Sequence, residues 1–506
     1  MYQRSSGLLC HVTSLPGAHG VGDLGKCAFE FVDLLARADQ HLWQVLPLGP
    51  AGAGDSPYDS RSSFAGNPLM ISISRLVESG LLRVSDVPET AGFPDDRVEF
   101  KRVERWKGRR LRRAFDNFQS GKAPSLQSSY EEFETAAGEW LDDFALYQAL
   151  REKHDGSPWY TWPPELRRPG TDVVSRARST LTSEIAFHKF VQFLFQLQWN
   201  ELKPYANARG ISIMGDIPIY VALDSADVWA NQDQFVLDDA GQPTVQAGVP
   251  PDLFTSDGQL WGNPVYDWDR MAQDDYRWWE RRIRRVFELT DIVRIDHFRG
   301  FAAGWQVPAG EKTARNGTWV TGPGRDFFDR LEERLGRLPI VVEDLGVITP
   351  DVEALRDGLG YPGMKVLQFA FGDGPDNPYL PHNIIPNSMV YTGTHDNETS
   401  AGWFSGLPTP EQRHVQKYLR ANRKSIHLDM IRAAWSSVAV LACTPVQDLL
   451  GLGNEARMNV PGVATRNWGW RLQDLERLRR RSHFLQSITE LYGRNHAPLE
   501  FREEQR

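Results

Sequence analysis

Eight short apolar runs punctuate the chain, and segments with a helical period lie between most of them. The apolar runs are rich in β-branched residues and cover residues 7–12, 42–48, 211–220, 292–298, 340–345, 366–371, 389–394 and 438–443. The helical patterns cover residues 29–38, 185–205, 278–289, 327–335 and 350–359. Nearly continuous apolar strands that alternate with helices are typical of a parallel sheet covered on both faces. Eight such strands predict an α/β fold of the (β/α)8 TIM-barrel type.

Two connections are much longer than a usual strand-to-helix loop. The first, about residues 49–178, contains amphipathic helical patterns and predicts a mostly helical inserted subdomain. The second, about residues 221–270, is rich in Gly, Pro, Asp and aromatic residues and predicts a long ordered loop. Both follow strands, so both are expected over the C-terminal mouth of one catalytic barrel that spans residues 1–506.

Three of the apolar runs end in a carboxylate that packing does not require: Asp296, Glu343 and Asp396. A single acid at a strand end is more often a helix cap. Here three acids lie at three strand ends, among the polar residues Arg294, His297, His395 and Asn397. Such polar density at a barrel mouth is costly to desolvate unless it serves a ligand, and paired carboxylates are the groups that glycoside chemistry needs.

The composition narrows the choice of partners. The net charge is −9 and the pI is about 5.8, which argues against a nucleic-acid partner. The three cysteines, Cys10, Cys27 and Cys443, are too few and too scattered for a disulfide framework or a thiolate metal site. No signal-peptide core and no membrane-length apolar run of roughly 18 residues is found. We therefore expect a cytoplasmic protein with no membrane partner, either a monomer or a homodimer.

Residues 20–27 match the G-x-G-x-x-G pattern and nearly match a phosphate-binding loop. Cys27 stands where that loop needs a hydroxyl residue for Mg²⁺, and the second apolar run ends without an acid for a ribose. A tight loop that leads into a helix is therefore the favoured interpretation. The histidines show no metal-ligand spacing and no G-x-S-x-G elbow occurs, so metal hydrolysis and serine esterase chemistry lack support.

The chain resembles the amylomaltases, the 4-α-glucanotransferases of the α-amylase-like clan (glycoside hydrolase family 77), over essentially its full length. The motifs that carry the resemblance in its first half are Ser6-Gly-Leu-Leu9, Thr13-Ser-Leu-Pro16, Gln44-Val-Leu-Pro-Leu-Gly-Pro50, Asp55-Ser-Pro-Tyr58, Phe64-Ala-Gly-Asn-Pro68 and Gly215-Asp-Ile-Pro-Ile219. Those in the second half are Gly248-Val-Pro-Pro-Asp252, Gln259-Leu-Trp-Gly-Asn-Pro264, Arg294-Ile-Asp-His-Phe-Arg-Gly300, Glu343-Asp-Leu-Gly346, Gly393-Thr-His-Asp-Asn397 and Arg457-Met-Asn-Val-Pro-Gly462. Matches in this order and spacing are highly specific.

The resemblance implies transfer of α-1,4-glucan segments to the 4-hydroxyl of an acceptor, through a covalent glucosyl-enzyme intermediate and without a cofactor or metal. It implies that Asp296 is the nucleophile, Glu343 the general acid/base, and Asp396 a transition-state stabiliser. Arg294 is expected to hold Asp296 ionised, and the pKa of Glu343 is expected to be raised. The substrate-binding residues that it implies are Arg294, His395, Asp216, Tyr58, Ser56, Asp252, Gln259, Trp261, Asn263, His297 and Asn467.

Two positions depart from the family pattern: Ala53 and Leu253 stand where the family often has aromatic residues, which puts remote glucan anchoring in doubt. Trp261 and Tyr58 remain the favoured stacking platforms because both lie in Gly- and Pro-rich loops. Two other functions stay open. A hydrolase of the same clan would share the three acids and pass the intermediate to water. A non-catalytic glucan-binding protein would tolerate loss of the acids.

Overall fold

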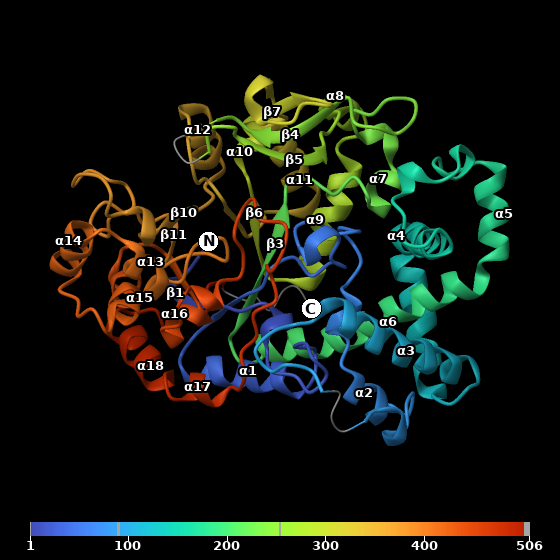
Figure 1. The fold of residues 1–506 in the computed structure, drawn as a ribbon, viewed down its shortest axis with the longest axis horizontal. Helices are drawn as coiled ribbons and strands as arrows, with labels where there is room; N and C mark the ends of the chain where they lie inside the picture. Colours follow the sequence, from blue (N-terminus) through green and yellow to red (C-terminus); the bar gives the residue numbers. More distant parts are fainter. Residues whose placement is uncertain (1, 89–91, 252–254, 500–506) are drawn as a thin grey trace.

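The computed structural model describes residues 2–88, 92–251 and 255–499. Eight parallel strands close into a barrel in the order β1-β12-β11-β10-β9-β6-β3-β2 (Figure 1). Their bounds are β1 Ser5–Leu9, β2 Leu42–Gln44, β3 Ser212–Pro218, β6 Ile292–Asp296, β9 Ile340–Val342, β10 Gly363–Val366, β11 Ser388–Tyr391 and β12 Leu441–Pro445. The TIM-barrel fold class predicted from the strand and helix pattern is confirmed.

Three predicted strands begin at the residue where the observed strand begins, at Leu42, Ile292 and Ile340, and extend two to four residues too far. The other predicted ranges differ from the observed strands by one to five residues at their ends. The largest displacement is at β10, which was expected over residues 366–371 and lies at Gly363–Val366. Its hydrogen-bonding register places Gly363 opposite Ser388, and a 3-10 helix follows at Leu367–Phe369. Lys365 interrupts the apolar pattern within this strand, so the apolar run begins where the strand ends.

The helices cover the outside of the barrel. The predicted helices appear as α1 Lys26–Arg37, α6 Thr182–Asn207, α9 Arg277–Leu289, α11 Gly324–Leu335 and α12 Pro350–Leu359. Further helices follow at α10 Arg299–Ala302, α13 Ser400–Gly406, α14 Thr409–Leu419, α15 Ile426–Ser436, α16 Val446–Leu450, α17 Glu476–Arg479 and α18 Ser482–Leu491. Within the described ranges, every helix is too short or too polar to cross a lipid bilayer.

The long connection at residues 49–178 contains α2 Ile73–Glu78, α3 Phe100–Gln119, α4 Gln127–Lys153 and α5 Asp172–Thr180. Figure 1 shows α3, α4 and α5 together on one side of the barrel. Residues 221–270, predicted as a loop, contain α7 Ala226–Ala230, β4 Val245–Val249, β5 Gln259–Pro264 and α8 Trp268–Gln273. With β7 Ala303–Pro308 and β8 Thr318–Thr321, which the sequence did not predict, β4 and β5 form a second sheet in the order β5-β4-β7-β8.

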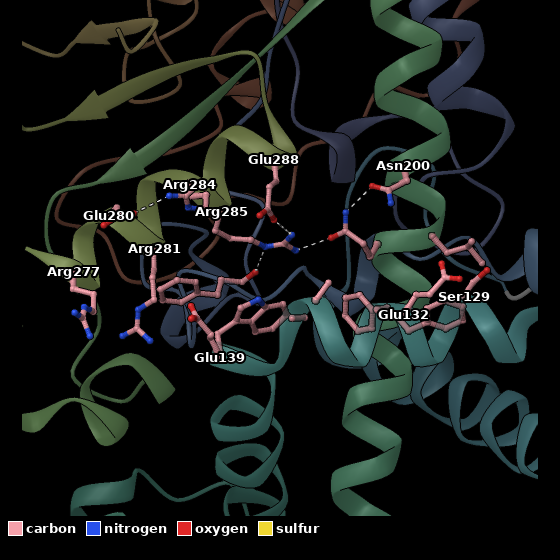
Figure 2. Close-up of a pocket in the computed structure, with 18 residues that line it drawn as sticks. Ser129, Glu132, Glu139, Asn200, Arg277, Glu280, Arg281, Arg284, Arg285 and Glu288 are labelled. Carbon is pink, nitrogen blue, oxygen red and sulfur yellow. Dashed lines mark hydrogen bonds and ion pairs between the residues drawn. The ribbon is translucent and has the colours of Figure 1, made fainter. Parts of the chain in front are cut away.

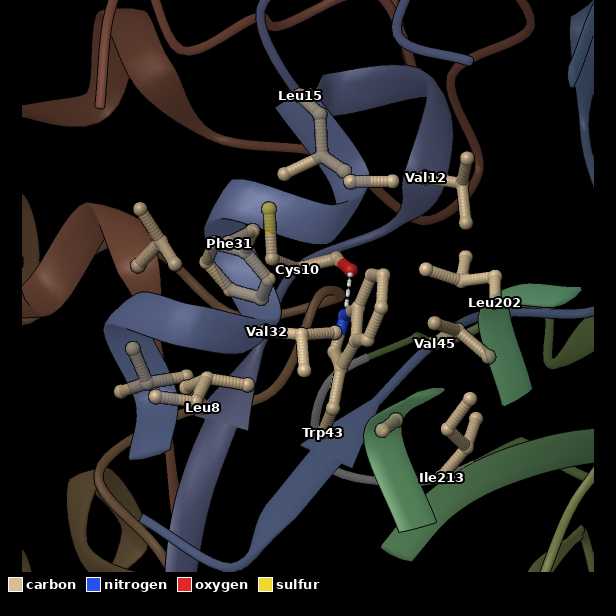
Figure 3. Close-up of a cluster of buried hydrophobic side chains, with 14 of the residues drawn as sticks. Leu8, Cys10, Val12, Leu15, Phe31, Val32, Trp43, Val45, Leu202 and Ile213 are labelled. Carbon is tan, nitrogen blue, oxygen red and sulfur yellow. Dashed lines mark hydrogen bonds between the residues drawn. The ribbon is translucent and has the colours of Figure 1, made fainter. Parts of the chain in front are cut away.

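The core between barrel and helices is apolar, with large aromatic side chains among aliphatic ones. Figure 3 shows Trp43 of β2 surrounded by Phe31 and Val32 of α1 and by Ile213 of β3. The indole N–H of Trp43 donates to the carbonyl oxygen of Cys10 at 2.8 Å, so this buried polar group is satisfied. Packing of this kind holds the strand ends rigidly, and the site is built on those ends.

Candidate active site

Arg294 of β6 binds two carboxylates at the mouth of the barrel. Its Nη1 donates to both carboxylate oxygens of Asp216, at 2.8 and 2.7 Å, and its Nη2 donates to Oδ1 of Asp296 at 2.7 Å. Arg294 and Asp296 share one face of β6 because side chains alternate along a strand, and Asp216 lies opposite Arg294 in the register of β3 and β6. The charge-assisted bonds fix the orientation of Asp296.

Asp216 is fully shielded from solvent. Its side chain is 0% exposed, and the Tyr58 hydroxyl donates to Oδ2 at 2.8 Å. Burial raises the pKa of Asp216 to about 6, against the opposing effect of Arg294. The sequence resemblance implied that Asp216 binds sugar, and this role stays a prediction. In the structure, the Asp216 carboxylate binds Arg294 and the Tyr58 hydroxyl.

Glu343 follows β9 and is held by the backbone. Its two carboxylate oxygens accept the N–H of His297 and the N–H of Leu345, both at 2.8 Å. Burial, followed by the charge of Asp296, raises the pKa of Glu343 to about 7, although Arg294 and the two N–H donors act in the opposite direction. A carboxyl group with this pKa can be protonated in one step and ionised in the next.

His297 adopts a left-handed backbone conformation, with φ = 55°. This conformation is costly for a non-glycine residue and is found mostly where function or packing requires it. Here the His297 N–H reaches the carboxylate of Glu343, and the His297 ring meets Trp261 edge-on at 4.8 Å. Burial lowers the pKa of His297 to about 4, so its imidazole is neutral at pH 7.

Asp396 follows β11 in a different setting. Nε2 of His395 lies 3.1 Å from Oδ2 of Asp396, and Asn459 donates to Oδ1 at 2.6 Å. Burial favours the protonated form, but the charge and hydrogen bond of His395 outweigh it and hold the pKa of Asp396 well below its usual range. The Tyr58 ring stacks on His395, with centroids 4.9 Å apart. Asp396 therefore stays ionised, and 40% of its side chain is exposed to the mouth.

The remaining expected substrate-binding residues divide into two groups. Ser56, Asn263 and Asn467 make hydrogen bonds that hold loops: Ser56 accepts from the Tyr58 N–H, Asn263 donates to Val221, and Asn467 donates to Val463. Gln259 and Trp261 are exposed on β5, where the Trp261 N–H donates to the Gln259 side chain at 3.2 Å. Asp252 and Leu253 lie outside the described residues.

Sequence reasoning missed three residues that shape this site. Asn459 and Arg457 bind the side chain and the carbonyl oxygen of Asp396, respectively, at 2.6 Å each. Trp468 packs against both Tyr58 and His395, with centroids 5.7 and 5.9 Å away. The family-like motif at residues 457–462 was the signal for the first two, but no local pattern pointed to Trp468.

Comparison with known proteins places this site in a family. The family model for 4-alpha-glucanotransferase matches residues 10–477. The chain is 49% identical to a Synechocystis 4-alpha-glucanotransferase, over 97% of this chain and 98% of the relative. It is 48% identical to that of Thermus thermophilus, over 93% of this chain and 95% of the relative. This chain belongs to the 4-alpha-glucanotransferase family.

A solved structure of the family agrees closely. The amylomaltase of Streptococcus agalactiae in complex with acarbose aligns with a TM-score of 0.94 at 38% identity, over 97% of this chain and all of that one. The Corynebacterium glutamicum amylomaltase shares the fold, with a TM-score of 0.77 at 21% identity. The resemblance to 4-alpha-glucanotransferases inferred from the sequence motifs is thus confirmed.

Proposed function

We propose that this 4-alpha-glucanotransferase moves α-1,4-glucan segments between maltooligosaccharides by a retaining double displacement centred on Asp296, Glu343 and Asp396. The observation that carries the proposal is the linked set of groups at the mouth: Asp216, Arg294 and Asp296 in one hydrogen-bonded row, with Glu343 beside them at a pKa of about 7. A carboxylate nucleophile beside a second carboxyl group that can give and take a proton is the arrangement that retaining glycoside chemistry needs.

In the first step, Oδ2 of Asp296 attacks the anomeric carbon of the donor. Arg294 binds Oδ1, and within the described part of the chain Oδ2 accepts no hydrogen bond, so it is available as the nucleophile. The glycosidic bond breaks as Glu343 transfers its proton to the leaving oxygen. The products are a glucosyl ester on Asp296 and a free glucan with a new 4-hydroxyl.

In the second step, the acceptor replaces the leaving glucan. The ionised Glu343 takes the proton from the acceptor 4-hydroxyl, and that oxygen attacks the anomeric carbon and displaces Asp296. Two inversions return the original α-configuration. Asp396, kept ionised by His395, accepts hydrogen bonds from sugar hydroxyls and favours the positive charge that develops on the ring.

Transfer is favoured over hydrolysis when an acceptor sugar, rather than water, attacks the glucosyl ester on Asp296. Trp261 is 36% exposed and meets His297, whose N–H binds Glu343, so its ring lies on the acid/base side of the site. A ring in this position stacks on an acceptor glucose and excludes water from the ester.

The test is incubation with maltotriose, following reducing ends and the oligosaccharide ladder. Longer products with constant reducing ends support the proposal. Shorter products with rising reducing ends show hydrolysis and overturn it. The cytoplasmic location, the monomeric or homodimeric state, and the division into one barrel with insertions at about residues 49–178 and 221–270 stay predictions.

A further inference from the structure

A large groove lies between α4, α6 and α9, and none of the site residues described above lines it (Figure 2). Its volume is about 1150 Å³. Small-molecule pockets measure about 300–1,000 Å³, so this α4–α6–α9 groove has room for several sugar units. Its residues come from the long helical connection, which supplies α4, and from the barrel helices α6 and α9.

The floor of the groove is aromatic and held in place. The ring of Trp140 is part-exposed and nearly parallel to that of Phe64, with centroids 6.4 Å apart and an interplanar angle of 18°. The Arg285 guanidinium lies 5.2 Å from the Trp140 ring and donates to the Phe64 carbonyl oxygen at 2.9 Å. Trp140 is therefore a fixed, flat surface, the kind of surface on which the apolar face of a glucose ring stacks.

The walls are polar and electrically balanced. Four arginines and four glutamates line the groove: Arg277, Arg281, Arg284, Arg285, Glu132, Glu139, Glu280 and Glu288. Arg284 pairs with Glu280 and Arg285 pairs with Glu288, both at 2.8 Å, and the amides of Gln196 and Asn200 add donors and acceptors.

The equal numbers of arginines and glutamates favour one class of ligand over the others. An anionic ligand would meet four glutamates, and an apolar helix would bury charged groups on both walls at a high cost. A neutral polyhydroxylated chain can use the donors and acceptors of both walls in equal measure. We propose that the α4–α6–α9 groove is an accessory binding site for the α-glucan chain, separate from the catalytic mouth. This inference rests on the proposed function for the choice of glucan.

The test combines turnover and titration in Trp140→Ala, with Trp106→Ala as the matched control. Trp106 is a part-exposed tryptophan of α3 that stacks on His19, outside the groove. In Trp140→Ala, KM for amylose should rise about fivefold, which equals about 1 kcal/mol, while kcat and KM for maltotriose stay within about twofold of wild type. Trp106→Ala should leave both substrates unchanged.

The titration uses Asp296→Asn to stop turnover, with maltoheptaose as the probe. Two binding sites per chain are expected in Asp296→Asn and one in Asp296→Asn/Trp140→Ala. One site in both proteins, or an unchanged KM for amylose, overturns the groove proposal. A loss of self-association in Trp140→Ala with intact glucan binding also overturns it, because the groove is then a protein interface. Failure of the proposed function is a separate result: wild-type protein then makes no ladder from maltotriose.

Discussion

Glu343 and Asp396 are carboxylates of the same mouth, yet their surroundings push their pKa values in opposite directions. Within the described residues, Glu343 accepts hydrogen bonds from two neutral backbone N–H groups, those of His297 and Leu345, and burial with the charge of Asp296 raises its pKa to about 7. Asp396 lies against His395, which holds its pKa below the usual range. The charge of the partner is therefore a main difference between the acid that can give up a proton and the acid that stays ionised.

The largest expected effect comes from removing the proton donor. Glu343→Gln should lower kcat on maltotriose by about 10³-fold, because the leaving oxygen is no longer protonated. α-Maltosyl fluoride needs no such proton, so this variant should still form the covalent ester from it, detected by mass spectrometry. Glu353→Gln on the exposed face of α12 is the control and should match wild type. An ester that fails to form from the fluoride would argue against Glu343 as the acid.

The same contrast predicts the pH dependence of wild-type turnover. The Glu343 pKa is raised, so its protonated form is present below pH 7 and is lost as pH rises through about 7. The Asp396 pKa is lowered, so Asp396 stays ionised throughout this range. kcat/KM for maltotriose should therefore fall above about pH 7, and a profile that stays flat to pH 9 would contradict this assignment.

Removing Arg294, the cation that Asp216 and Asp296 share, should lower both stability and turnover. Arg294→Met leaves Asp216 buried without its partner, which should lower the free energy of unfolding by about 3–5 kcal/mol. Urea unfolding measures this change. Adding Asp216→Asn removes the carboxylate charge that Arg294 no longer neutralises. The double variant should therefore regain part of the lost stability but not the turnover. Equal stability of the single and double variants would show that the two residues are not coupled.

A smaller loss of turnover is expected when a residue that binds Asp396 is removed. Asn459→Ala removes the 2.6 Å hydrogen bond to Oδ1 and should lower kcat/KM for maltotriose by about tenfold, because one anchor of the ionised carboxylate is lost. Asn383→Ala is the control, since Asn383 bonds the backbone oxygens of Pro375 and Asn377. Equal turnover in the two variants would remove Asn459 from the site.

The smallest change in activity is expected from Trp261, which lies near Glu343. Trp261→Ala opens the space over His297 to water, so hydrolysis should rise about threefold relative to transfer, with little change in total turnover. Reducing ends and glucose release from maltotriose measure the ratio. Trp319→Ala is a matched control because Trp319 is 42% exposed, close to the 36% of Trp261. A ratio that changes equally in both variants would argue against a specific role for Trp261.

Much of this architecture could be predicted from local pattern, because buried barrel strands are short apolar runs and the three acids lie at or shortly after the ends of three of them. The second sheet could not, because β4 and β7 lie more than fifty residues apart and contain glycine and polar residues, so only their pairing defines them. Trp468 was missed for the same reason: it reaches Tyr58 and His395 from an irregular segment far along the chain. The burial of Asp216 likewise depends on contacts with Arg294 and Tyr58 that no local pattern reveals.

The most direct test of the central contrast is a ¹³C NMR titration of labelled carboxyl groups, with the signals assigned by their loss in Glu343→Gln and Asp396→Asn. We expect Glu343 to titrate near pH 7 while Asp396 stays ionised down to the lowest pH at which the protein is folded. Glu343 titrating near its ordinary value of about 4, or Asp396 titrating alongside it, would contradict the division of roles between the two acids.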